Sequence, residues 1–544
     1  MKYIFVSGGV ISGLGKGIVT ASLSLLLKNL GLKVAPIKID MYLNFDAGTL
    51  RPQEHGETFV LADGMETDQD MGNYERFLGE DLPRLNYVTT GQIYAEVLRK
   101  ERAFEYEGDT VEAIPHVTNE IINRLRNAGE KVKADVVVIE LGGTVGEYQN
   151  GIFFEANRIL KLKNPADVIH IHVTYLPFIQ AVGELKSKPA QTSVHILNSM
   201  GIQPDFIVAR SERTVDKKRA DKIALFCNVV PDDLILDPDS KSVLEVPQIL
   251  DDQSLSEKVC HKLNLSPKAK NVVLPDWKKM VKKSFETKNE ITIGMAVKYF
   301  KSGDYCLSDS YVSVIEAIKH ASAQLEIKTN IKWIDTEGLE VSGEQLEEID
   351  GLIVPQGWGS RGVEGKIKAV QFARENNLPY LGLCFGMQMA VVEFARNVCQ
   401  MKGANSIEAN PKTKYPVISI MEDQKKYLEK HQYGGTIRLG QWPAVISRKT
   451  KLYELYEKES VLERHRHRYE FNNKYKKALE KCGLVVSATS PDGKLVEAIE
   501  IPNHPFFIGT QYHPELQSRP LTPHPIFLGF LEACLKYEGT DKVN

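Results

Sequence analysis

Cysteine is scarce in this sequence, and so are long apolar runs and any excess of charge of one sign. The seven cysteines among 544 residues are scattered and form no Cys-x-x-Cys pair, which argues against a disulfide framework and a zinc site and favours the cytoplasm. No uncharged apolar run approaches the length that spans a bilayer, and the N-terminus runs directly into a predicted strand, so we expect neither a membrane segment nor a signal peptide. The 68 Lys and Arg residues balance 71 Asp and Glu residues, which gives no electrostatic argument for binding nucleic acid or a membrane.

What the chain does contain is a repeated alternation of short β-branched strands with helical patterns. Such alternation indicates βαβ units and mostly parallel sheets. The stretch 267–289 differs, because it is rich in lysine and holds few apolar residues. We therefore predict two doubly wound α/β domains with mostly parallel sheets, 1–266 and 290–544, joined by a linker. The basic run in the linker is interpreted as a solvated helix face.

The first predicted strand leads into a glycine-rich turn with a lysine, which predicts a phosphate-binding loop. The turn reads Gly8-Gly9-Val10-Ile11-Ser12-Gly13-Leu14-Gly15-Lys16-Gly17. Glycines let backbone N–H groups approach phosphates, the following helix adds a favourable dipole, and Lys16 supplies a charge. The turn departs from GxxxxGK[ST] twice, since Val10 replaces the first glycine and Gly17 replaces the Ser or Thr that would bind Mg²⁺.

Two carboxylates are placed to replace that missing metal ligand. Asp70 ends the stretch Glu66–Asp70, and Glu140 ends an apolar strand just before two glycines. A carboxylate at the carboxyl end of a central strand points into the nucleotide crevice of a doubly wound sheet. We predict that Asp70 and Glu140 bind Mg²⁺, a cation that prefers oxygen ligands. The alternative is a glycine turn with a surface lysine and no ligand.

A second site is predicted around Cys384. The stretch 379–388 has the pattern of a strand, a sharp turn at Cys384 and a helix, which exposes a nucleophile at the start of a helix. His513 and Glu515 lie two residues apart on a segment predicted to be extended, so Glu515 can orient His513. The glycine-rich loop 354–362 could stabilise an oxyanion. A lone cysteine at such a turn is more often a core residue, but the three pieces in this order favour nucleophilic catalysis.

These residues resemble those of the CTP synthase family. The second half is similar to a class I glutamine amidotransferase domain, in which a Gly-x-Cys-x-Gly-x-Gln turn precedes a distal His-Pro-Glu. The first half resembles the synthetase domain of that family, and the resemblance covers nearly the whole chain. The matching stretches are 7–17, 38–40, 55–57, 66–70, 74–77, 97–102, 140–146, 186–191, 222–228, 434–440 and 463–469. The resemblance implies that ATP phosphorylates the 4-oxygen of UTP, and that ammonia from L-glutamine displaces the phosphate to give CTP.

The resemblance also implies roles for individual residues. Cys384 would form a glutamyl thioester, with His513 as general base and then acid and Glu515 as its partner. Glutamine would be bound by Gly357, Phe385, Gly386, Met387, Gln388, Glu408 and Arg468. ATP would be bound by Gly13, Leu14, Gly15, Lys16, Gly17, Ile18, Lys38 and Asp70, with Mg²⁺ on Asp70 and Glu140. UTP or CTP would be bound by Ser12, Glu147, Tyr148, Gln149, Lys186, Ser187, Lys188, Pro189, Ala190, Gln191 and Lys222.

Regulation and assembly are implied in the same way. GTP activates the family and CTP inhibits it, with Arg438 as a candidate for the GTP effect, His55 near the ammonia entrance, and a homotetramer as the assembly. The chain departs from the family pattern without losing a catalytic group. Gln356 replaces a glycine of the oxyanion loop, and Met41, Ala47, Gln149 and Phe385 also differ, which indicates a divergent member with altered regulation.

Two alternatives stay open at this point. One is another glutamine-dependent amide ligase that acts on a carboxylate such as a cobyrinic-acid-type substrate, although the lysines between 186 and 222 favour a nucleotide. The other is a diverged regulatory or filament-forming paralogue, against which the intact residues of both predicted sites argue.

Overall fold

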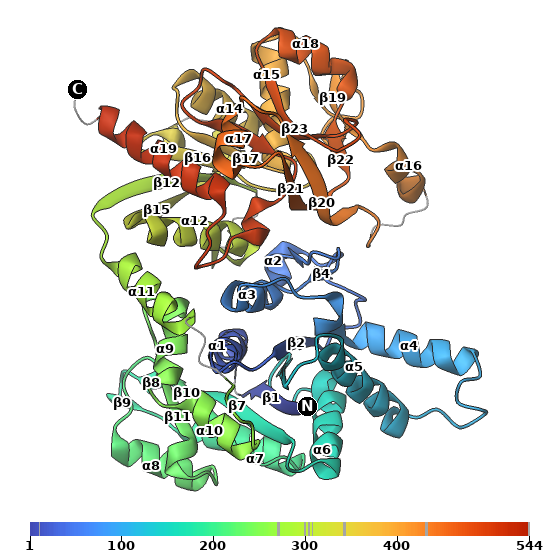
Figure 1. Cartoon of the computed structure of the whole chain (residues 1–544), viewed down its shortest axis with the longest axis vertical. Coiled ribbons are helices and arrows are strands. Elements are labelled where there is room, and N and C mark those ends of the chain that lie inside the picture. The colour runs from blue at the N-terminus through green and yellow to red at the C-terminus, as the bar shows by residue number, and fades with distance from the viewer. Residues whose placement is uncertain are drawn as a thin grey trace. The chain divides into compact units, whose positions relative to one another are not determined.

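The computed structural model describes residues 1–9, 11–268, 273–298, 301–302, 305–306, 308–340, 344–429 and 434–541. They form two compact units, the first of Met1–Asp46 and Asp70–Lys279 and the second of Ala47–Gln69 and Met280–Asn544. The units thus differ from the predicted domains, because residues 47–69 belong to the second unit. The predicted linker contains helix α11 (Val273–Phe285) (Figure 1). In this helix the buried indole of Trp277 donates to the carbonyl of Leu244 at 2.8 Å.

The first unit is built on a parallel seven-stranded sheet. Its strands lie in the order β11 (Leu234–Pro238), β10 (Phe206–Ser211), β7 (Val168–Leu176), β1 (Lys2–Gly8), β6 (Val136–Leu141), β2 (Val34–Asp40) and β5 (Tyr87–Thr89). All the pairings in this sheet are parallel. The strands are buried on both faces, which explains why they appear in the sequence as continuous apolar runs.

Helices cover both faces of this sheet. Ile4 and Val6 of β1 point to one face, and Tyr3 and Phe5 point to the other. The first face packs against α1 (Lys16–Asn29), α9 (Val246–Asp251) and α10 (Leu255–Lys262); the second packs against α4 (Thr90–Arg102), α5 (Thr118–Lys131) and α6 (Gly151–Lys163). Helices α7 (Lys188–Ser199) and α8 (Lys217–Phe226) share a smaller core with β10. The carboxyl ends of β1, β2 and β6 are thereby brought to one edge of the sheet.

The second unit contains a nine-stranded mixed sheet. Its order is β15 (Ile327–Asp335), β12 (Asn289–Val297), β16 (Gly351–Val354), β17 (Tyr380–Leu383), β25 (Phe507–Thr510), β24 (Val496–Glu500), β23 (Val485–Thr489), β20 (Arg438–Ile446) and β21 (Ser460–His467). Pairings from β15 to β25 are parallel and those from β25 to β21 are antiparallel. One face packs against α14 (Val363–Glu375) and α15 (Phe385–Asn397), the other against α12 (Val312–Leu325) and α19 (Pro525–Asp541). The prediction of two α/β domains is confirmed, and the antiparallel half is a feature that the alternation pattern does not reveal.

The cysteines differ from the prediction at one pair. Cys399 and Cys482 are paired as a disulfide in the second unit, with their Cα atoms 5.8 Å apart, a single pair that the scattered cysteines of the sequence did not predict. The two residues are 83 positions apart, at the ends of α15 and α18 (Lys476–Lys481), and the tertiary fold rather than a sequence motif brings them together. Within the described part of the chain, no helix combines the length and the apolarity needed to cross a membrane.

Candidate active sites

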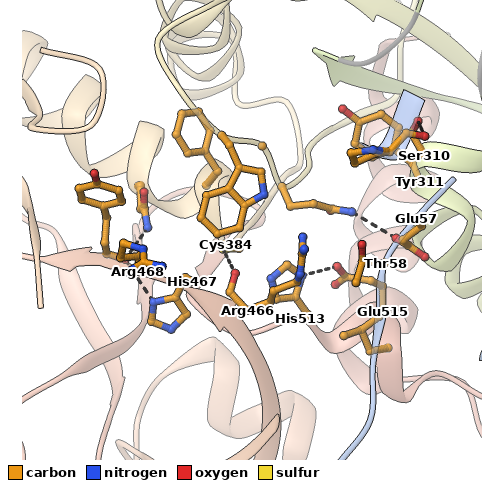
Figure 2. Close-up of a pocket in the computed structure, with 18 of the residues that line it drawn as sticks. Glu57, Thr58, Ser310, Tyr311, Cys384, Arg466, His467, Arg468, His513 and Glu515 are labelled. Atoms are coloured by element: carbon orange, nitrogen blue, oxygen red, sulfur yellow. Dashed lines mark hydrogen bonds and ion pairs between the residues drawn. The ribbon is translucent and has the colours of Figure 1, made fainter. Parts of the chain in front are cut away.

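Cys384 occupies a sharp turn between β17 and α15 in the second unit. Its φ of 52° and ψ of −98° are unusual for a residue with a side chain. Gly386 permits the turn, because a Cβ there would lie 1.9 Å from the carbonyl oxygen of Val354. The thiol of Cys384 lies 3.8 Å from the carbonyl oxygen of Arg466 (Figure 2). It also accepts the side-chain amide of Gln511 at 3.6 Å. A strained turn at the start of a helix is typical of an enzyme nucleophile.

His513 and Glu515 form the second part of this site. His513 Nδ1 lies 2.7 Å from Glu515 Oε1 (Figure 2). The predicted extended conformation is wrong at Glu515, which lies in the 3-10 helix η9 (Pro514–Gln517) that turns its carboxylate back to the imidazole. Burial opposes a charge on His513, but Glu515 and the negative charge that Cys384 can carry outweigh burial and raise the pKa of His513 to about 10. The buried Nε2 of His513 has no hydrogen-bond partner among the described residues, so it is available to exchange a proton with a substrate.

Two lysines hold the loop that follows β16. Lys366 Nζ donates to the carbonyl of Pro355 at 2.7 Å, and Lys298 Nζ donates to the carbonyls of Trp358 and Gly359, each at 2.7 Å. The carbonyl groups of the predicted oxyanion loop are thereby fixed in hydrogen bonds. Fixed dipoles of this kind are what an oxyanion site requires.

The same two lysines lie beside the aromatic ring of Phe385, the residue that follows Cys384. The ammonium groups of Lys298 and Lys366 lie 4.8 and 5.4 Å from the ring centroid of Phe385. Burial lowers the pKa of Lys298 to about 8 and that of Lys366 well below its usual value. An aromatic ring suits this position, because its face attracts cations. The ring of Phe385, one of the departures from the family pattern, thus lies beside two lysine side chains.

A pocket in the second unit collects most of the residues predicted to bind glutamine. Gly357, Phe385, Gln388, Glu408 and Arg468 line it together with Cys384, His513 and Glu515. Glu408 accepts the backbone N–H of Gly359 at 2.6 Å, and burial raises its pKa. Arg468 donates to Gln424 and Thr436, each at 3.0 Å. Gly386 and Met387 are buried and are not among the described residues that line the pocket.

The segment 47–69 contributes residues to this pocket that the sequence analysis missed. Pro52, Glu57 and Thr58 line it, and Figure 2 shows Glu57 and Thr58 on the side of Glu515. Glu57 accepts the side-chain amide of Gln356 at 3.2 Å and the backbone N–H of Ser313 at 2.9 Å. These partners are 299 and 256 positions away, and no local pattern in the sequence indicates them. His55, given a role by resemblance, ends α2 (Pro52–His55) and is exposed.

Arg438 is buried rather than presented to solvent. It lies in an ion pair with Glu497 at 2.8 Å, and Glu470 is 3.7 Å away. Burial raises the pKa of Glu470 to about 7. The residue implied for the GTP effect thus belongs to an internal charge network.

The glycine-rich turn of the first unit places Lys16 at the start of α1. Gly13 and Gly15 have φ of 73° and 81°, and Val10 lies outside the described residues. Lys16 Nζ donates to the carbonyl of Gly143 at 2.8 Å, and burial lowers the pKa of Lys16. Ile18 and Leu14 pack in the core beneath the turn.

Gly17 has a structural reason to replace the usual Ser or Thr. A Cβ at this position would lie 2.1 Å from Asp70 Oδ1. The glycine therefore makes room for the carboxylate of Asp70, near the start of α3 (Gln69–Leu78). A carboxylate occupies the space where a P-loop hydroxyl would otherwise stand.

Three carboxylates surround the ammonium group of Lys38 beside this turn. Lys38 Nζ lies 3.0 Å from Glu140 Oε1 and 3.8 Å from Asp40 Oδ1, and it also pairs with Asp70. Burial and the charge of Asp70 raise the pKa of Glu140, which also accepts the hydroxyl of Tyr74. Within the described ranges, no group of three or more His, Cys, Asp or Glu is arranged to hold a metal. The carboxylate oxygens of Asp70 and Glu140 are of the kind that Mg²⁺ prefers, and both pair with Lys38.

Part of the predicted UTP site lies together in the first unit. The residues that line a cavity of about 370 Å³ include Lys186, Ser187, Lys188, Gln191, Arg219 and Lys222, together with Glu184, which pairs with Lys186 and Arg219. Several cations around one cavity suit a triphosphate. Pro189 and Ala190 continue α7 beside it, with Ala190 fully buried. Four other predicted contacts are not among its lining residues: Ser12, the exposed Tyr148, Gln149, and Glu147, which accepts both the N–H and the hydroxyl of Thr144 at 2.6 and 2.7 Å.

Comparisons with known proteins match both halves of the chain. Residues 2–265 match the family described as CTP synthase N-terminus, and residues 306–533 match Glutamine amidotransferase class-I. A CTP synthase of Bacillus subtilis is 47% identical over 540 residues, which cover 98% of this chain and 99% of that protein. A CTP synthase of Methanocaldococcus jannaschii is 49% identical over 546 residues, which cover 98% of each. Among solved structures, the glutaminase domain of Trypanosoma brucei CTPS with bound acivicin is 38% identical, covers 45% of this chain and 94% of that one, and has a TM-score of 0.42.

Proposed function

This chain belongs to the CTP synthase family, and from that premise we propose that it aminates UTP to CTP with ATP and with ammonia released from L-glutamine. One observation carries the proposal. A pocket with Cys384, His513 and Glu515 and a site with Lys16, Lys38 and converging carboxylates occur in the same chain. The first arrangement suits acyl transfer from an amide, and the second suits phosphoryl transfer.

The glutaminase step begins with attack of Cys384 Sγ on the carboxamide carbon of glutamine. His513 holds the thiol proton and passes it to the departing nitrogen, so that ammonia leaves and a glutamyl thioester remains. Water then attacks the thioester, loses a proton to His513 and releases glutamate with the regenerated thiol. Glu515 supports the imidazolium in this step, because its negative charge raises the pKa of His513.

Around this reaction, other pocket residues bind the substrate. Glu408 suits the α-ammonium of glutamine, and Arg468 suits its carboxylate because a guanidinium matches that geometry. The backbone N–H groups of Gln356 and Gly357 would receive the oxyanion.

In the first unit, the turn from Gly13 to Lys16 would hold the phosphates of ATP, and Lys38 would contact the phosphate in transfer. Asp70 and Glu140 would hold Mg²⁺, which when bound neutralises phosphate charge. The 4-oxygen of UTP takes the phosphate. Ammonia then attacks carbon 4 of the uracil, and the phosphate leaves together with that oxygen. The triphosphate of UTP or CTP suits the lysine-lined cavity. Activation by GTP, inhibition by CTP and a homotetramer belong to the same proposal.

The test uses the full chain and the variant Cys384→Ala. With UTP, ATP and Mg²⁺, we expect the wild type to make CTP from either glutamine or free ammonia, measured by chromatography. The variant should lose glutamine-dependent synthesis and keep ammonia-dependent synthesis. Loss of both activities would contradict two separable sites, and a wild type that makes no CTP from either source would overturn the proposal in favour of another amide ligase or a regulatory paralogue.

A further inference from the structure

Gln356 brings a polar side chain into a loop where the family resemblance implies a glycine. The loop follows β16 and lines the same pocket as Cys384 and His513. The amide of Gln356 is therefore an addition to the site, which the proposed glutaminase reaction does not use.

The orientation of this amide is fixed by Glu57. Gln356 Nε2 donates to Glu57 Oε1 at 3.2 Å, and Glu57 Oε2 accepts the backbone N–H of Ser313 at 2.9 Å. An ionised carboxylate can only accept hydrogen bonds, so the NH₂ end of Gln356 must face it. Oε1 then lies on the opposite corner of the amide, where it is buried and has no hydrogen-bond partner among the described residues.

The pocket holds two further buried oxygens of this kind. Gln388 Oε1 and Glu515 Oε2 also lack hydrogen-bond partners in the described part of the chain. A buried acceptor without a donor costs free energy, and a ligand that brings N–H groups removes that cost. The pocket is therefore rich in acceptors and suits a substrate whose reacting end carries hydrogen-bond donors. A primary carboxamide has such a group, and an ester does not.

We propose that Gln356 is a specificity-determining residue, whose Oε1 accepts a hydrogen bond from the carboxamide nitrogen of glutamine. This inference rests on the proposed glutaminase function. When the C–N bond breaks, the nitrogen gains a proton and becomes ammonia, which still donates to the same oxygen. Glu57 positions Gln356 for this contact without touching the substrate. The pocket should then prefer amide substrates to ester substrates, because a site built to bind N–H groups disfavours an analogue that lacks them.

The test compares two substrates in the full chain. Glutamate release is measured from L-glutamine and from L-glutamic acid γ-methyl ester, whose leaving group has no N–H. For Gln356→Gly we expect the amide-to-ester ratio of kcat/KM to fall by about tenfold, the size expected for loss of one hydrogen bond, because the backbone N–H at position 356 serves both substrates and the side-chain oxygen serves only the amide. The amide-to-ester ratio is the readout, since a purely structural role would lower both values together.

A matched variant separates the acceptor from the shape of the loop. Gln356→Met keeps the length of the side chain and lacks the oxygen, so it should lower the ratio as much as Gln356→Gly. Ammonia-dependent CTP formation and thermal unfolding serve as folding controls and should stay unchanged. An unchanged ratio in both variants, or an equal loss on both substrates, would overturn the inference while leaving the proposed function intact. A wild type that releases no glutamate from glutamine would overturn the proposed function and this inference with it.

Discussion

At the scale of single residues, the chemistry of the glutaminase pocket depends on how charges act on His513. Burial alone would keep this imidazole neutral, and the neighbouring carboxylate and thiol reverse that effect. A histidine whose pKa lies near 10 keeps its proton throughout the neutral range. The charge on His513 then depends on the carboxylate of Glu515, so any loss of that carboxylate should lower the rate of glutamine hydrolysis.

Replacing Glu515 by Gln tests this dependence. The substitution removes the charge that stabilises the imidazolium, so the pKa of His513 should fall, as measured by NMR titration of its ring. Glutamine hydrolysis should drop by about 10²-fold or more, the usual contribution of a positioned acid and base. Glu463→Gln is the matched control, because Glu463 contacts His524 at 3.1 Å instead of His513. An unchanged titration of His513 in Glu515→Gln would contradict the account.

At the scale of elements, the first turn of α1 leaves space for a side chain from the start of α3. The glycine at the second position of α1 leaves room for the carboxylate of Asp70, which a Cβ would meet at 2.1 Å. The hydroxyl that is missing from the phosphate-loop pattern is therefore replaced by a carboxylate from another helix. A sequence pattern alone shows the missing hydroxyl and not its replacement.

Restoring the usual serine should consequently harm the protein. In Gly17→Ser the new side chain displaces the carboxylate of Asp70, and ammonia-dependent CTP formation should fall by about 10²-fold, the loss that a displacement near 1 Å can cause. Glutamine hydrolysis should persist, since the second unit is untouched. Gly151→Ser is the matched control, because Gly151 lies at the start of α6 and a Cβ there would meet no heavy atom of the described residues within 4 Å. Equal or higher activity in Gly17→Ser would show that the hydroxyl is compatible with the site.

Local sequence patterns predicted some elements of the fold and of the two sites, and they missed others. Alternating strands and helices predicted both α/β domains, because buried parallel strands and amphipathic helices leave local patterns. The turn at Cys384 and the lysine at α1 were also visible, since each depends on neighbouring residues. The antiparallel half of the second sheet, the disulfide and the contact between Glu57 and Gln356 were not, because each depends on residues brought together only by the tertiary fold.

At the scale of the whole molecule, residues 47–69 belong to the second unit although the first unit flanks them in sequence. Within the second unit, the carbonyl of Val60 accepts Arg464 at 3.0 Å, and Glu66 pairs with Arg466 at 2.8 Å. Phe59, Val60 and Leu61 are fully buried. The segment is thus held within the second unit by residues that lie hundreds of positions later in the chain.

A fragment of residues 1–279 should therefore keep its parallel sheet and lose the order of this segment. Without the second unit, Val60 and Glu66 lose their contacts with Arg464 and Arg466, so local opening becomes easy and proteases reach the backbone. Limited proteolysis followed by mass spectrometry should detect cleavage within 47–69 at least about tenfold faster in the fragment than in the full chain, because cleavage follows the population of the open state. The exposed stretch 103–110 of the first unit is the internal reference and should be cut at the same rate in both. Equal protection of 47–69 in the fragment would mean that the first unit can hold this segment by itself.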